Sequence, residues 1–164
     1  MEFIRRLIDL FRKNKKTLPK GFTLIELVVV IGILAILLAI VLIAINPGRQ
    51  FKQANDTKRR SDVNALLNAI HQYAADNKGD LPSGITVAPA KNISNTGADI
   101  CAAISPTYIS ALPVDPSTKK DAITDCAAVG GYDTVYQVVK DANGRVTVSA
   151  SETEIATPDI SVTR

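Results

Sequence analysis

The sequence predicts an α+β fold in which one long amino-terminal helix, with a membrane-spanning first half, packs on a small antiparallel sheet of about three strands. Three observations predict this fold. Leu27–Ile45 contains no charged residue, residues 49–77 carry apolar side chains at helical spacing, and residues 132–164 alternate between apolar and polar side chains. The first two segments indicate helices, and the third indicates strands.

The charge of the chain is concentrated at its amino terminus. The 164 residues include 19 Lys and Arg and 16 Asp and Glu, but residues 1–21 hold seven of the basic side chains and only two of the acidic ones. Because the rest is slightly acidic, the basic composition does not imply a nucleic-acid-binding domain. We expect a basic leader at 1–21, a transmembrane and assembly helix at 22–46, and a periplasmic or extracellular head at 47–164.

The apolar segment is long enough to cross a bilayer. Nineteen uncharged residues at about 1.5 Å each span about 29 Å, which is close to the hydrocarbon thickness of a membrane. A secretory signal peptide is the alternative, but its apolar core usually has only about 7 to 15 residues. The preceding basic residues predict a cytoplasmic amino terminus, although the basic run Lys58-Arg59-Arg60 on the far side weakens this asymmetry.

Glu26 is an acid near the start of the apolar segment. A carboxylate within a spanning helix is costly and usually faces a partner, and the alternative is that it reaches the headgroup layer and marks only the helix start. The residues around it read KGFTLIEL over positions 20–27. This motif and the apolar helix after it closely resemble the start of type IV prepilins and pseudopilins.

The resemblance implies roles for three residues. A membrane-embedded prepilin peptidase would cleave between Gly21 and Phe22, and the new amino group of Phe22 would be N-methylated. Glu26 would neutralise the amino group of a neighbouring subunit in the filament and so set its axial register. The implied partners are copies of the chain, related minor pilins, the prepilin peptidase, an inner-membrane assembly platform, and membrane lipid before assembly.

The head begins with a helix and ends with a sheet. Asn46-Pro47-Gly48 predicts a helix break, after which a helix is expected over 49–77. Its apolar stripe includes Val63, and we expect Lys58 and Arg59 to lie away from that stripe. A loop region is expected over 78–131, with a short strand near 85–88.

The predicted sheet covers residues 132–164. Strands are expected at 132–140 and 145–150, joined by a tight turn whose Asn143-Gly144 pair accepts positive φ. A last short strand is expected at 159–163.

Cys101 and Cys126 are the only cysteines. A metal site needs more ligands, and His71, the sole histidine, is expected to be an ordinary helix residue. For an exported head we expect these cysteines to form a disulfide. No cofactor is expected, and calcium is a minor alternative because the loop acids lack the alternating spacing of a calcium loop. These acids are Asp115, Asp121, Asp125 and Asp133.

No nucleophile with a base, no paired carboxylates and no phosphate loop can be recognised in the sequence, so we do not expect an enzyme. The run Lys58-Arg59-Arg60 is a candidate DNA contact, but a solvated face or an intersubunit patch is the preferred interpretation. By resemblance, we expect a structural subunit of a type IV pilus-like filament, which moves from the cytoplasmic membrane to a pilus or the cell surface. The alternatives are a major pseudopilin of a type II secretion system and a single-span membrane-anchored binding module, for example in DNA uptake.

Overall fold

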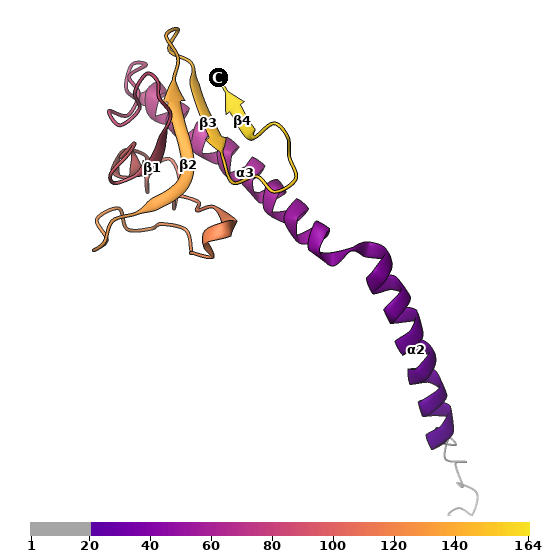
Figure 1. Ribbon diagram of the computed structural model, residues 1–164. Coiled ribbons are helices and arrows are strands. Elements are labelled where there is room, and N and C mark those ends of the chain that lie inside the picture. Colours follow the sequence, from indigo (N-terminus) through magenta and orange to yellow (C-terminus); the bar gives the residue numbers. More distant parts are fainter. Residues whose placement is uncertain (1–20) are drawn as a thin grey trace, which may run out of the picture. The chain divides into compact units, whose positions relative to one another are not determined.

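The computed structural model describes residues 21–164, which divide into two compact units between Ile45 and Asn46 (Figure 1). The expected leader, apart from Gly21, therefore lies outside the described residues. The fold is α+β, as the sequence predicts, with a long apolar helix and an antiparallel sheet. The sheet has four strands, one more than expected.

Helices α2 (Leu24–Ile45) and α3 (Pro47–Asp76) are separated by a single residue. Asn46 has a left-handed φ of 43°, and Pro47 supplies no amide donor to continue the preceding helix. The side chain of Asn46 caps α3, because its Oδ1 accepts a hydrogen bond of 3.3 Å from the Arg49 N–H. The backbone thus leaves helical geometry where the Asn-Pro-Gly sequence predicts it, and α3 starts two residues earlier than expected.

The head contains one sheet of order β1-β2-β3-β4 in which all neighbours are antiparallel. The strands are β1 (Lys91–Ser94), β2 (Asp133–Lys140), β3 (Val146–Ala150) and β4 (Ile160–Thr163), and the short helices are α4 (Cys101–Ile104) and the 3-10 helix η1 (Pro116–Thr118). Strands β2 and β3 form the predicted hairpin. In its turn Gly144 has a φ of 86°, whereas Asn143 does not have positive φ.

Strand β1 was not predicted, and the strand expected near residues 85–88 does not form. In that segment Val87 makes only an isolated bridge to Lys140. The β1 sequence is polar apart from Ile93, so it lacks the alternating apolar pattern that indicates a strand. It forms because it pairs with β2 at the edge of the sheet and buries the Ile93 side chain completely.

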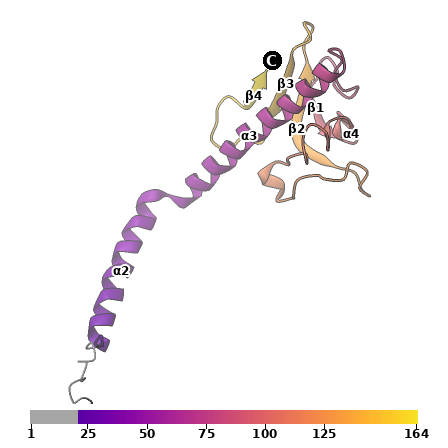
Figure 2. The same ribbon diagram turned by 180° about the vertical axis from the view of Figure 1, so that it is seen from behind.

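Helix α3 lies across one face of the sheet, as the view from behind shows (Figure 2). The core between them combines the apolar stripe of α3 with inward side chains of the strands and loops. Its fully buried members include Val63, Leu66, Leu67, Ile70, Ile93, Ile100, Ile104, Leu112, Tyr136, Val146 and Val148. The register pairs Val138 with Val148 across β2 and β3, so both side chains lie on the face that packs against the core.

Candidate functional site

The segment that precedes α2 is accessible. Gly21, Phe22 and Thr23 lie outside the helix and are exposed, and a Cβ atom placed on Gly21 would meet no other atom within 4 Å. A peptidase needs a peptide bond that is free of regular structure and open to approach. The bond between Gly21 and Phe22 has both properties.

Glu26 takes part in a capping box at the start of α2. The Thr23 N–H donates to Oε2 of Glu26 at 3.4 Å, and the Glu26 N–H donates to Oγ1 of Thr23 at 3.2 Å. The sequence signal for this arrangement is Thr-x-x-Glu before an apolar run, and residues 23–26 carry it, although no helix cap was predicted there. Among residues 21–164 no cation forms an ion pair with Glu26, so any charged partner must come from elsewhere.

Apart from Glu26, the surface of α2 is apolar, and it is uncovered. None of its 22 residues is buried, and an 18-residue stretch within it has a mean hydropathy of 3.6, so the helix is apolar enough and long enough to cross a membrane. At about 1.5 Å per residue it extends about 33 Å. An apolar surface of this size requires lipid or other protein to cover it.

In the head, four charged residues form a largely buried ionic cluster, defined here as Asp56, Arg59, Asp115 and Glu154. Arg59 is fully buried and donates to both carboxylate oxygens of Asp115, at 2.8 and 2.9 Å. Its Nη1 also donates to Asp56 at 2.8 Å and to Glu154 at 3.2 Å. The expectation that Arg59 lies away from the apolar stripe is therefore wrong. It precedes Val63 by four residues and so shares the inward face of α3.

The contacts within the ionic cluster shift the pKa values of Asp56 and Arg59. Burial opposes ionisation of Asp56, but backbone N–H groups of Glu154, Ile155 and Ala156 donate to its carboxylate and outweigh that effect. Together with Arg59 they lower the pKa of Asp56 from 3.8 to about 2. The hydrogen bonds that Arg59 donates to Asp115 raise the pKa of Arg59 despite its burial. Asp56 and Arg59 thus stay ionised, and the cluster ties α3 to two distant loops.

The predicted disulfide between Cys101 and Cys126 is present, with 5.6 Å between the two Cα atoms. Its Cys101 end starts helix α4 in the core, where the Cys101 N–H donates to the hydroxyl oxygen of Tyr132 at 3.2 Å. That hydroxyl donates in turn to Asp99 at 2.7 Å. Burial, followed by the interaction with Asp99, raises the pKa of Tyr132 to about 12. The disulfide and Tyr132 hold the loop between η1 and β2 against the core.

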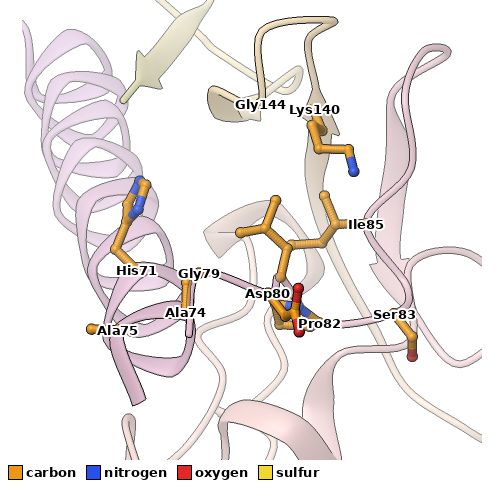
Figure 3. A pocket seen from close by; sticks show the side chains of 11 residues that line it. His71, Ala74, Ala75, Gly79, Asp80, Pro82, Ser83, Ile85, Lys140 and Gly144 are labelled. Carbon is orange, nitrogen blue, oxygen red and sulfur yellow. The ribbon is translucent and has the colours of Figure 1, made fainter. Parts of the chain in front are cut away.

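A hollow of about 800 Å³ lies near the carboxyl end of α3 (Figure 3). His71, Asp80 and Lys140 line it, but no hydrogen bond joins any two of them within the described chain. The Nε2 atom of His71 is buried without a hydrogen-bond partner. Within the described residues, these three side chains thus form no hydrogen-bonded acid–base or nucleophilic pair.

The apolar helix, its exposed preceding segment and its single acid agree with a comparison against known families. The family described as the prokaryotic N-terminal methylation motif matches residues 19–42. No curated protein and no solved structure matches the chain. The match contains Gly21, Phe22 and Glu26 and covers most of α2. The chain therefore carries the prokaryotic N-terminal methylation motif, the signal segment of type IV prepilins and pseudopilins.

Proposed function

We propose that the chain is a structural subunit of a type IV pilus-like filament and that it assembles through α2 (Leu24–Ile45). One observation carries the proposal: the match to the methylation motif covers most of a 22-residue apolar helix that has no buried side chain. Lipid covers this surface before assembly, and the helices of neighbouring copies cover it afterwards. No catalytic activity is part of the proposed role.

Processing precedes assembly in this proposal. Prepilin peptidase cleaves between Gly21 and Phe22, and the Phe22 amine is then methylated. Cleavage removes a leader with seven basic and two acidic side chains and leaves a helix tip with one ammonium group. A strongly cationic tail holds a helix at the cytoplasmic membrane surface, so its removal makes extraction from the bilayer easier. The exposed position of the bond between Gly21 and Phe22 supports cleavage at this bond.

Glu26 sets the axial register of each subunit. Two opposite charges about 4 Å apart attract by about 4 kcal/mol at an effective dielectric of about 20. A subunit that entered the filament at the wrong height would leave the Glu26 carboxylate and a neighbour's Phe22 ammonium unpaired in an apolar core. The lack of any ion pair to Glu26 within the described chain supports a partner from another copy.

Two alternatives remain distinct from this proposal. A major pseudopilin of a type II secretion system would use the same segment and the same assembly platform, but its filament would stay in the cell envelope. A membrane-anchored binding module would keep α2 in the bilayer and form no polymer. In all three cases the head lies outside the cytoplasmic membrane.

Two measurements test the proposal, one in cells that express the full chain and one in cells that lack it. Mass spectrometry of the membrane protein is expected to show an amino terminus at methylated Phe22, and an intact leader would favour the anchored module. Electron microscopy of cells that lack the protein is expected to show no surface fibres. If external fibres persist while secretion fails, the pseudopilin alternative is correct.

The substitution Glu26→Gln isolates the charge from the helix cap. Glutamine also fits the capping box, so the start of α2 is preserved while the carboxylate is lost. The neighbour's ammonium then stays unpaired, which costs about 3 to 5 kcal/mol and reduces filament yield by at least about a hundredfold. The matched control is Glu152→Gln, the same chemical change at an exposed site of the head. Unchanged filament yield in Glu26→Gln would refute the register role.

A further inference from the structure

The amino-terminal part of α3 borders a groove on the surface of the head. Its two adjoining hollows, of about 350 and 470 Å³, share Arg49 and Ile155 as lining residues. The helix forms one wall, and the loop that precedes β4 forms the other. Ile155 is 40% exposed and provides an apolar floor. Arg49 and Arg60 are 11 residues apart, which is about three helical turns, so they project from the same face of α3.

The groove has an uncompensated positive charge. Arg49, Lys52 and Arg60 are exposed, and none forms an ion pair within residues 21–164. The two nearby acids do not neutralise them. Asp56 is engaged by three backbone N–H groups and Arg59, and Glu154 is engaged by Arg59 and Asn55. Both acids therefore accept hydrogen bonds from groups of the head itself, whereas the three cations are exposed on its surface.

A second surface of the head has the complementary properties. The loop between η1 and β2 contains the exposed residues 127–130, and the Val129 side chain is fully exposed. Asp125 and Asp133 lie four residues to either side of Val129, are exposed, and pair with no cation in the described chain. Lys120 lines a hollow of about 260 Å³ together with Asp125 and Asp133, but within residues 21–164 it forms no ion pair with either acid. We call this apolar tip with its two flanking acids the acidic knob.

We propose that the acidic knob of one copy docks into the arginine-lined groove of a second copy of this chain. Val129 would cover Ile155, and Asp125 and Asp133 would face Arg49 and Arg60. The knob and the groove of one copy belong to the same compact unit, and no residue of the knob lines the groove. The knob therefore does not fill the groove of its own copy.

Such a contact joins two different surfaces, so each added copy presents a free groove and a free knob for the next. A heterologous contact of this kind generates an open helical filament rather than a closed pair. The inference rests on the proposed filament function and adds the head surfaces that would recognise each other. The apolar centre supplies buried area, and the charges at its edges select the partner and its orientation.

Photocrosslinking in assembled filaments tests the contact directly. The substitution Val129→p-benzoylphenylalanine places a photoreactive group on the knob without altering the native cysteines. Irradiation is expected to give covalent ladders, and mass spectrometry is expected to map the link to the groove around Ile155. The matched control places the same group at Ala142, an exposed position in the β2–β3 turn, where no link to the groove is expected. Filaments whose position-129 links map elsewhere would overturn the contact but leave the proposed function intact.

Charge reversal provides a second, independent test. Arg49→Glu with Arg60→Glu, and Asp125→Arg with Asp133→Arg, are each expected to reduce filament yield by about tenfold because attraction becomes repulsion. Combining all four substitutions is expected to restore the yield. Absence of this rescue, in variants that retain the native disulfide, would refute the charge pairing.

The groove also follows the apolar span closely in sequence, so an anionic lipid surface is a competing occupant. If Arg49→Glu with Arg60→Glu abolishes binding to phosphatidylglycerol vesicles and position 129 gives no link to the groove, the proposal is overturned in favour of a membrane contact. If the unmodified chain never polymerises, the proposed function fails and the contact fails with it.

Discussion

Replacing Asp56 with asparagine tests the ionic cluster of the head. The Asp56 carboxylate accepts hydrogen bonds from the backbone N–H groups of residues 154–156 at 2.8 to 3.0 Å, and from Arg59 at 2.8 Å. Asparagine keeps one acceptor oxygen and loses the charge. Some of the four donors then stay unsatisfied in a buried place, and each such loss costs about 1 to 3 kcal/mol. We expect Asp56→Asn to lower the free energy of unfolding by about 2 to 4 kcal/mol at pH 7.

The electrostatic part of this loss depends on pH. The folded pKa of Asp56 is about 2, below the ordinary value of 3.8, so ionised Asp56 stabilises the folded state above pH 4. That contribution, about 2 kcal/mol, disappears as the pH falls from about 4 through 2. The stability difference between wild type and Asp56→Asn is therefore expected to shrink over this pH range.

The tyrosines make the measurement specific to the head. The chain has four tyrosines and no tryptophan, and all four tyrosines lie in α3 or beyond it. The tyrosine band of the near-ultraviolet circular dichroism spectrum, recorded for the full chain in detergent micelles during urea unfolding at several pH values, thus reports the head alone. The exposed Asp121→Asn serves as the control and is expected to change stability by less than about 0.5 kcal/mol. An Asp56→Asn deficit that is equally large at pH 7 and pH 2.5 would refute the electrostatic explanation.

Three further substitutions test other parts of the structure. Replacing Cys101 and Cys126 with serine is expected to lower the free energy of unfolding by about 3.5 kcal/mol, because the disulfide closes a loop of about 25 residues. Urea unfolding measures this loss, and adding reductant should not destabilise the variant further. Tyr136→Phe removes the 2.8 Å hydrogen bond to the partly buried Asp62 and is expected to cost about 1 to 3 kcal/mol in the same assay, whereas a loss below 0.3 kcal/mol would mean that water replaces the hydroxyl. Thr23→Ala removes the cap of α2 but keeps the charge of Glu26, so we expect about 1 kcal/mol of lost helix stability and filaments that still form; complete loss of filaments would contradict the separation of cap and charge.

Long, regular patterns made the helical part of the fold predictable from the sequence. The uncharged run of α2 and the apolar stripe of α3 each extend over several turns, so a few exceptions do not obscure them. The hairpin of β2 and β3 was predictable because alternating strands flank a turn that contains Gly144. In each case the signal is local, and neighbouring residues alone determine the structure.

The missed features depend on contacts between residues far apart in the sequence. Strand β1 exists because β2, about 40 residues later, supplies its hydrogen bonds. Arg59 looked like a surface cation because the carboxylates that make its burial possible come from Asp115 and Glu154. The sequence shows where Arg59 falls on the helix, on the same face as Val63. It does not show that two distant loops bring acids to that place.

The orientation of the Asp56 carboxylate links the ionic cluster to the cationic groove. Asp56 lies four residues before Arg60 and about two helical turns after Arg49, so a freely exposed carboxylate at this position would be placed to pair with Arg60. The backbone N–H groups of residues 154–156 instead hold the Asp56 carboxylate against the loop that precedes β4, where Arg59 also reaches it. The same hydrogen bonds position Ile155 on the groove floor. The interior contacts that stabilise the head thus leave the outer arginines unpaired, and an acidic surface of another copy can supply the charge that Asp56 does not.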